Sequence, residues 1–482
     1  MRLTTGRFVA APLHGLLLLL LLSSSQANAS GLYFSDRGVR PLGRGGAWVA
    51  GADDVGAMWY NPAGLADAGT SILSDFSWLH FTSEYTRKSQ ATDVNGTVRT
   101  YDFPSVNGTS PVLPIPTIGA SYAFGERKEW TAAFGILAPY TAITSYPLTV
   151  NGGAPSPSRY SLVSLDGSAL VIPGLYMAYK PIEEIRVGIG LQALVGTFAS
   201  TEVFSACPTD HLVCAPEDPT YDSFAQLKVG PIFAPSGNGG VTIVPEKHVR
   251  IGISGQLPFT INAPATVSVK LPNAVVFDKA QQVGKDAHVR FKLPAVLRAG
   301  IEGRNEFSNK SLLRVEATYV REFWSAHDAI NITPDNITLT NIQGFPSPFG
   351  VAPISLPRNF QDSNSFRLGG EYTLAVSGYV IDVRMGANYE TSAVPNAYLS
   401  PLTIDMDKVT VAIGGGLHIG EHWRLDGVYA HVFTGGTTVS PAEAAVPRVN
   451  PVRGNPTPTD AINGGTYSAR ADVLGVGLNY KF

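Results

Sequence analysis

The sequence predicts an all-β protein: a 14-stranded antiparallel transmembrane β-barrel with an N-terminal hatch, or plug, inside its lumen. Three observations support this prediction. Large apolar residues alternate with small or polar residues over many short stretches, tight turns alternate with long loops between these stretches, and a glycine-rich piece precedes the first of them. The composition agrees, with 50 glycines, 22 phenylalanines, 19 tyrosines and only 15% charged residues.

Residues 1–29 have the pattern of a secretory signal peptide. Arg2 and Arg7 precede the apolar run Leu16–Leu22, and Ala27–Asn28–Ala29 has the small-x-small form of a cleavage site. An uncleaved membrane anchor is the alternative, but the run is shorter than the roughly 20 apolar residues that a spanning helix needs. We therefore expect an exported protein whose mature chain begins near Ser30.

The alternating pattern is clearest at the C-terminus. Leu474, Val476, Leu478, Tyr480 and Phe482 share one face of a predicted strand, and the residues between them are mostly small or polar. Such a face covers a core in a soluble sandwich and contacts lipid in a membrane barrel, so one strand does not decide between them. Several other predicted strands carry aromatic residues near both ends of the apolar face, which is typical of the interfacial girdles of a barrel.

The connections between the strands favour the membrane barrel. Strands are expected over residues 70–86, 115–124, 130–140, 166–180, 185–204, 223–244, 249–258, 284–303, 311–323, 364–376, 379–390, 407–419, 422–433 and 467–482. Long, polar loops are expected over 87–114, 141–165, 205–222, 259–283, 324–363, 391–406 and 434–466, and tight turns fill the other connections. Short turns at one end and long loops at the other are the plan of an outer-membrane barrel, and an even number of strands lets the sheet close without an edge.

Residues 30–69 are predicted to fill the barrel, which we assign to residues 70–482. A barrel of this size leaves a lumen that would leak if nothing occupied it. The segment is rich in glycine, which suits irregular packing inside a tube. A disordered tail is the alternative, but Trp48, Trp59 and Leu65 are large apolar residues of the kind that disordered tails lack.

Two further features concern covalent and ionic contacts. Cys207 and Cys214 are the only cysteines, and an exported chain meets an oxidising compartment, so we expect them to form a disulfide rather than a metal site with His211. The residues expected on the lumen face of neighbouring strands are Arg314, Glu316, Arg367, Glu371, Asp382 and Arg384, followed by Arg424 and Asp426. Because their signs are mixed, we interpret them as an ion network rather than a ligand site.

Several stretches resemble a known family. They are NPAG (61–64), LAPY (137–140), SRYSLVS (158–164), PGLYMAYKP (173–181), VRIGISGQLP (249–258), NYETSAVPNAYLSP (388–401) and the terminal YKF. Together they resemble the FadL-type outer-membrane transporters of long-chain fatty acids and aromatic hydrocarbons. The resemblance implies a hatch motif at Asn61, Pro62 and Ala63, and a kinked third strand that opens laterally. Gly135 and Pro139 are the candidates for the kink, although Pro139 could equally end that strand at the rim.

The resemblance implies transport of hydrophobic molecules across the outer membrane by diffusion, with lateral exit. Tyr140, Ile143, Phe259 and Ile261 are candidates for a capture surface in the outer loops. Fatty-acid transporters of the family carry a basic residue in the fifth strand. Residues 194–198 contain none here, so the sequence supports an apolar ligand better than a carboxylate ligand.

The expected partners are small hydrophobic molecules, outer-membrane lipid and lipopolysaccharide, and the barrel assembly machinery, with the protein acting as a monomer. No cofactor, metal or nucleic acid is expected, the net charge being −3. An enzyme is disfavoured because no G-x-S-x-G motif occurs. A general porin and a structural or adhesive barrel remain as alternative functions.

Overall fold

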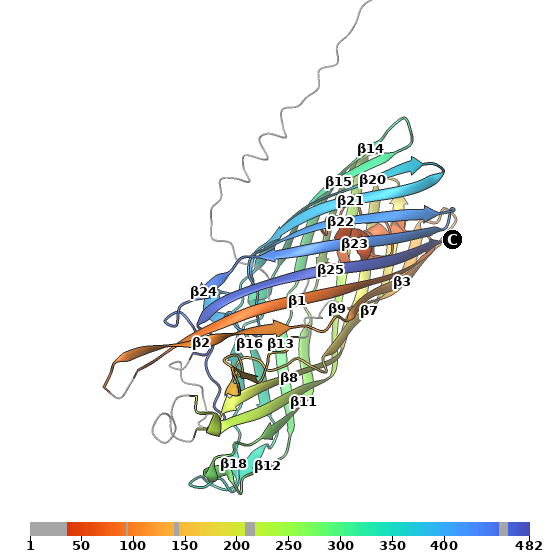
Figure 1. Ribbon diagram of the computed structural model, residues 1–482. Coiled ribbons are helices and arrows are strands. Elements are labelled where there is room, and N and C mark those ends of the chain that lie inside the picture. The colour runs from red at the N-terminus through yellow and green to blue at the C-terminus, as the bar shows by residue number, and fades with distance from the viewer. Residues whose placement is uncertain (1–35, 93–94, 139–143, 208–216, 453–460) are drawn as a thin grey trace, which may run out of the picture.

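The computed structural model describes residues 36–92, 95–138, 144–207, 217–452 and 461–482. Strands dominate it, and in these ranges no helix is both long and apolar enough to cross a membrane. Figure 1 shows one long tube of tilted strands, with tight turns at one end and extended loops and small sheets at the other.

Fourteen of the described strands form a closed antiparallel barrel, as predicted. They are β1 (Ser71–Thr92), β3 (Pro114–Phe124), β4 (Trp130–Leu137), β7 (Ala169–Ile182), β8 (Ile185–Ser205), β9 (Asp222–Glu246), β10 (Val249–Gln256), β14 (Val296–Glu306), β15 (Leu312–Glu322), β20 (Ser363–Val376), β21 (Tyr379–Glu390), β22 (Lys408–Ile419), β23 (Trp423–Thr434) and β25 (Gly465–Lys481). The barrel closes where β1 pairs with β25, from Ser71 opposite Lys481 to Arg87 opposite Gly465. Closure leaves no unpaired sheet edge in lipid.

The outward face of the barrel is apolar. Leu368, Met385, Ile413 and Leu474 are exposed on neighbouring parts of the wall. At the short-turn end, Trp130 stacks on Tyr179, and Tyr480 contacts both Trp423 and Phe482. An apolar band bounded by aromatic rings is the surface that a bilayer requires of a barrel.

The N-terminal residues 36–69, here called the lumenal segment, lie inside the barrel. The segment contains α2 (Val39–Gly43), α3 (Ala57–Tyr60) and the 3-10 helix η1 (Pro62–Asp67), drawn in orange and red within the tube in Figure 1. Most of its residues are buried, including Trp48 and Trp59. The strand pattern alone could not place this segment, because it contains no strand.

Glycines in the wall let the lumenal segment approach the barrel backbone. A Cβ atom on Gly188 of β8 would lie 2.3 Å from the carbonyl carbon of Pro62 and 2.4 Å from the nitrogen of Ala63. A Cβ atom on Gly369 of β20 would lie 1.9 Å from the carbonyl oxygen of Arg44. Real side chains do not fit at these distances, so glycine is required where the two backbones touch.

The long-loop end contains more regular structure than the sequence predicts, and this corrects the predicted loops. The additional strands are β2 (Val98–Thr109), β5 (Thr149–Val150), β6 (Ala154–Pro155), β11 (Thr260–Lys270), β12 (Gln281–Val283), β13 (Asp286–Lys292), β16 (Ala329–Pro334), β17 (Thr338–Thr340), β18 (Phe349–Gly350), β19 (Ile354–Pro357) and β24 (Thr437–Val439). The 3-10 helices η2 (Pro219–Tyr221), η3 (Val275–Phe277), η4 (Trp324–Ala326) and η5 (Asn396–Tyr398) lie among them.

One predicted strand and one predicted loop differ from the structure. Residues 284–303 are not one strand: β13 ends at Lys292 and β14 begins at Val296, because Pro294 cannot donate to a ladder. The predicted loop 259–283 contains β11, which pairs with β9 and β13 and extends the sheet above the barrel. The alternating apolar residues of β11 therefore face the inside of that extension.

Replacing Gly188 with valine should displace the lumenal segment, because the side chain would overlap the backbone at Pro62 and Ala63. We expect proteoliposomes with the Gly188→Val protein to admit glucose at least several times faster than wild type. Gly427→Val is the matched control, since a Cβ atom there meets nothing within 4 Å in the described structure. Equal sugar permeability of both variants and the wild type would show that this contact does not hold the lumen closed.

Candidate ligand-binding site

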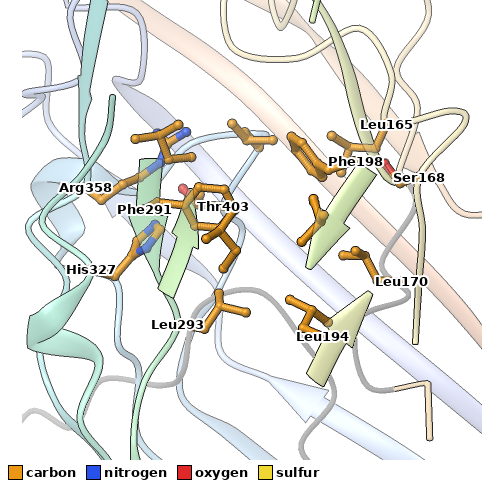
Figure 2. A pocket seen from close by; sticks show the side chains of 14 residues that line it. Leu165, Ser168, Leu170, Leu194, Phe198, Phe291, Leu293, His327, Arg358 and Thr403 are labelled. Carbon is orange, nitrogen blue, oxygen red and sulfur yellow. The ribbon is translucent and has the colours of Figure 1, made fainter. Parts of the chain in front are cut away.

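An apolar cavity of about 100 Å³ lies between the barrel and the long-loop end. Its lining comes from the inward faces of barrel strands and of the extension above them. The lining residues are Leu165, Ser168, Leu170, Leu194, Phe198, Ile232, Ile261, Phe291, Leu293, His327, Ile330, Arg358, Leu402 and Thr403. Figure 2 shows Leu165, Leu170 and Leu194 on one side, with His327 and Arg358 on the other.

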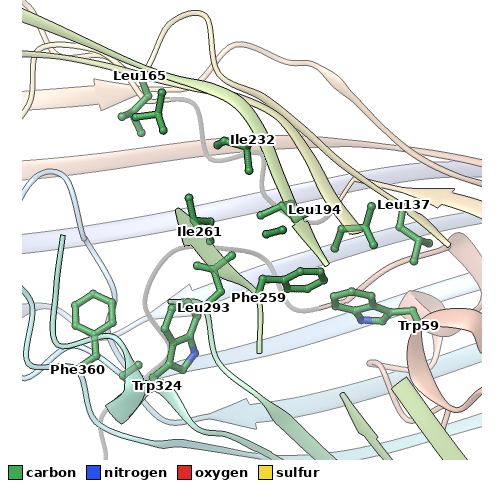
Figure 3. Close-up of a cluster of buried hydrophobic side chains, with 14 of the residues drawn as sticks. Trp59, Leu137, Leu165, Leu194, Ile232, Phe259, Ile261, Leu293, Trp324 and Phe360 are labelled. Carbon is green, nitrogen blue, oxygen red and sulfur yellow. The ribbon is translucent and has the colours of Figure 1, made fainter. Parts of the chain in front are cut away.

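The cavity joins the apolar core that covers the lumenal segment. One cluster of buried hydrophobic residues includes Trp59 of the lumenal segment, Leu194 of β8, Phe259 and Ile261, and Trp324 of η4. Figure 3 shows Trp59 beside Phe259, and these residues connect through Leu194 and Ile261 toward Leu293. The lumenal segment thus forms part of the floor beneath the cavity.

His327 is one of two buried ionisable groups at the cavity. It is 1% exposed and its Nδ1 lies 2.7 Å from the carbonyl oxygen of Lys292. Since a carbonyl only accepts, Nδ1 carries the proton, and the neutral ring presents a lone pair at Nε2. No atom in the described part of the chain partners Nε2. Burial lowers the pKa of His327 to about 4, so the ring is neutral at pH 7.

Arg358 is the second group, and the Glu202 carboxylate interacts with it electrostatically. It is 3% exposed, and its guanidinium makes no hydrogen bond and no ion pair within 4 Å among the described residues. Burial lowers the pKa of Arg358 to about 10, and the nearby Glu202 carboxylate opposes that shift. A buried, unpaired guanidinium is costly, and it offers donors suited to a carboxylate.

The structure relocates two of the predicted capture residues. Phe259 and Ile261 are both 0% exposed, so the expectation that they form an exposed capture surface is wrong. Ile261 instead lines the cavity, because β11 turns its apolar face inward. Tyr140 and Ile143 lie outside the described residues, as does Pro139.

Gly135 lies in β4, opposite Gly119 of β3 and Gly174 of β7. A Cβ atom on it would lie 2.2 Å from Cε of Met58, so this glycine makes room for the lumenal segment. The described part of β4 pairs regularly up to Leu137, and the proposed kink therefore stays a prediction.

Sequence reasoning missed Arg358 and His327. Both stand in the predicted loop 324–363, where a single arginine or histidine has no periodicity to mark it as inward-facing. Three other basic residues of the barrel and its loops are engaged elsewhere: Arg159 pairs with Asp222, Lys180 with Glu183, and Arg186 with Asp67. The only available signal was an arginine within the apolar stretch SLPRNF (355–360).

The predicted lumen charges lie together beneath the cavity and contact the lumenal segment. Arg384 donates to Glu371 at 2.5 Å, to Asp382 at 2.6 Å and to Asp426 at 2.6 Å. From the lumenal segment, Arg40 pairs with Glu371 at 2.7 Å, and Asp53 pairs with Arg314 at 2.8 Å.

Two more of these charges bind the segment directly. Glu316 accepts from the backbone nitrogens of residues 49, 50 and 51, at 2.6, 2.9 and 2.9 Å. Arg367 pairs with Asp36. The buried charges are therefore compensated, either within the wall or by partners on the lumenal segment, as burial requires.

Asn61, Pro62 and Ala63 join the lumenal segment to the wall. The amide nitrogen of Asn61 donates to the carbonyl oxygen of Val49 at 2.9 Å and to Oγ1 of Thr242 at 3.0 Å. Its side-chain oxygen accepts from the nitrogen of Ala63 at 3.1 Å and so caps η1. Asn61 thereby fixes the turn that Pro62 begins.

Cys207 is disulfide-bonded. Cys214, the other cysteine of the sequence, lies outside the described residues. No group of three or more metal-ligating side chains suited to a metal ion occurs in the part of the chain that the structure describes.

A closed, antiparallel 14-stranded barrel with an apolar outer band defines the class of outer-membrane β-barrel proteins. The chain belongs to the outer membrane protein transport protein family (OMPP1/FadL/TodX), whose model matches residues 20–482. The predicted family, fold class and outer-membrane location are confirmed. By the plan of such barrels, the short-turn end faces the periplasm and the long-loop end faces the outside.

Solved structures with the same fold support this assignment. A Pseudomonas aeruginosa FadL homologue has a TM-score of 0.67 and 14% identity, covering 94% of this chain and 100% of that one. The Ralstonia pickettii toluene transporter TbuX has a TM-score of 0.57 and 19% identity, covering 93% and 99%. The Pseudomonas putida toluene transporter TodX has a TM-score of 0.61 and 14% identity, covering 93% and 99%.

Replacing Glu371 with glutamine should destabilise the protein strongly. The change removes the carboxylate shared by Arg40, Arg314 and Arg384 and leaves buried cations uncompensated. We expect a loss of about 3–5 kcal/mol in the free energy of unfolding, measured by denaturant titration in detergent. Glu183→Gln is the matched control: it breaks a surface pair with Lys180 and should cost less than about 1 kcal/mol. Equal losses would mean that the network contributes no more than a surface pair.

Proposed function

We propose that this protein transports long-chain carboxylic acids, the fatty-acid class of amphipathic molecules, across the outer membrane. The observation that carries the proposal is the unpaired Arg358 in the wall of an otherwise apolar cavity. An aromatic hydrocarbon offers a buried guanidinium a cation–π contact but neither a negative charge nor a hydrogen-bond acceptor atom. A carboxylate does, with charge-assisted hydrogen bonds.

The cavity offers a different surface to each end of such a molecule. The apolar tail contacts the leucine side of the cavity, and each buried methylene contributes about 0.8 kcal/mol. The carboxylate pairs with Arg358. A molecule that arrives protonated can donate its O–H to the free Nε2 of His327. The site can therefore accept either protonation state of the head group.

Replacing Arg358 with methionine tests this assignment, because methionine keeps the apolar bulk and removes the charge. We expect the affinity for oleate to fall at least tenfold and the affinity for toluene or hexadecane to stay equal or rise. Binding is measured by titration of purified protein in detergent. Arg321→Met, at a surface ion pair with Asp362, is the matched control and should change neither. Unchanged oleate binding in Arg358→Met would remove the carboxylate from the proposal, and free passage of sugars through reconstituted wild type would favour a general porin.

We further propose that the ligand leaves sideways into the bilayer. The axial route leads through the paired charges that join the lumenal segment to the wall, where an apolar tail finds no favourable surface. β4 has only 8 residues, as few as β10, and it adjoins β3 with 11, whereas β1 on the other side of β3 has 22. A gap in the upper wall beside β3 and β4 would open toward lipid.

Proteoliposomes loaded with albumin distinguish the two routes. Lateral exit delivers oleate to the bilayer, so we expect its protein-dependent transfer rate to be the same with or without albumin inside. Axial exit delivers oleate to the internal water, and the rate would then rise with internal albumin. Liposomes without protein provide the baseline, and a severalfold albumin dependence would contradict lateral exit.

A further inference from the structure

A second cavity, of about 410 Å³, lies at the short-turn end of the barrel. Unlike the apolar cavity, it is lined by charged and polar residues, which include Arg186, Arg250, Arg304, Lys481, Asp67 and the turn residue His422. We call it the vestibule. It lies where the lumenal segment ends, since Asp67 is the last residue of η1.

One carboxylate serves several cations in this cavity. Asp67 accepts from Nε of Arg186 at 3.0 Å and from Nη2 of Arg250 at 2.7 Å. Lys481 is exposed at the rim, and its ammonium lies 3.7 Å from where a Cβ atom on Gly69 would stand. Lys481 has no ion pair in the described part of the chain. The whole lining holds six arginine and lysine cations against three carboxylates, Asp53, Asp67 and Glu421, so positive charge is in excess.

Hydrogen-bond donors are also left over. Arg250 is 4% exposed, and its Nε has no partner among the described residues. Arg304 lies on β14, which pairs with β10. In the register of these two strands, Arg250 of β10 lies opposite Glu302. Arg304 pairs through Nε with Glu302 at 2.5 Å, but its Nη2 is buried without a hydrogen bond in the described structure and lies 3.7 Å from Asp53. Guanidinium donors in excess of carboxylates match the oxygens of a phosphate group.

We propose that the vestibule binds a phosphate group, held by Arg186, Arg250 and Lys481. A dianion compensates more of this excess positive charge than a monoanion such as acetate does. The volume of the vestibule admits a phosphate that is attached to a larger molecule. Two sources have this chemistry: a soluble phosphate ester in the periplasm, and the headgroup of an anionic phospholipid in the inner leaflet.

Asp67 occupies the same donors and therefore competes with the bound phosphate. Replacing Asp67 with asparagine should raise the affinity for phosphate at least fivefold, because Arg186 and Arg250 lose their only shared carboxylate. If Asp67 had only a structural role, its replacement would leave the affinity for phosphate unchanged or lower it. The same competition connects the vestibule to the lumenal segment, which contains Asp67.

The test uses the purified full-length protein in a nonionic detergent, titrated with inorganic phosphate by calorimetry at constant ionic strength in chloride. We expect saturable binding of phosphate and sulfate, with acetate at least tenfold weaker. Arg250→Gln should weaken phosphate binding at least tenfold and Lys481→Gln at least threefold. Lys481 is exposed, so its variant should fold, and unchanged oleate binding verifies this.

A flat phosphate titration, or phosphate binding that survives Arg250→Gln and Lys481→Gln in folded protein, overturns the proposal. So does an Asp67→Asn protein with unchanged affinity. The source is found by repeating the titration in nanodiscs. Weaker binding of added phosphate in phosphatidylglycerol than in phosphatidylcholine nanodiscs identifies the lipid headgroup as the occupant, and equal binding together with tight binding of glycerol phosphate identifies a soluble ester.

Discussion

The structure depends on the compensation of charges buried between the barrel wall and the lumenal segment. A barrel of 14 strands encloses more space than its own inward side chains fill, and the wall contributes buried arginines and carboxylates to that space. None of these charges is tolerable without a partner. Arg384 is paired within the wall, whereas Arg314 and Glu371 take partners from the lumenal segment. Wall and segment are therefore parts of one electrostatic unit.

The packing of the lumenal segment sets the position of the apolar cavity. Gly188 and Gly369 let the segment touch the wall backbone, and Asn61 fixes the turn between α3 and η1. Trp59 is then held at the top of the segment, where it joins the apolar cluster that surrounds the cavity. The cavity thus has a charged layer beneath it and an apolar layer around it. The separation suits a ligand that is mostly hydrocarbon.

Sequence reasoning predicted the barrel well because a strand in lipid must alternate over its whole length, as Leu474 to Phe482 do. It predicted the turns for the same reason. It failed above the membrane, where β11 and β13 pair with strands far away in the chain and no local pattern reveals the partner. Phe259 looked like a loop residue because its burial comes from β8, the lumenal segment and η4 rather than from its own neighbours.

The candidate site was the least predictable part for a similar reason. His327 and Arg358 are thirty residues apart and meet at the cavity only because the loop between them folds back as β16 and β19. Their chemistry also depends on what is missing around them. Arg186 has a carboxylate at 3.0 Å and Arg358 has none that close, and the sequence alone does not distinguish these two environments.

The short strand β4 changes how the membrane itself meets this protein. Its 8 residues span roughly 26 Å at about 3.3 Å each, and a tilt of about 40° reduces the height to roughly 20 Å, less than the ~25 Å apolar band of a typical barrel. The described strand β4, like the equally short β10, is therefore shorter than the hydrocarbon layer is thick. If the ligand leaves sideways as proposed, the acyl chains of the outer leaflet beside β4 form one wall of its route.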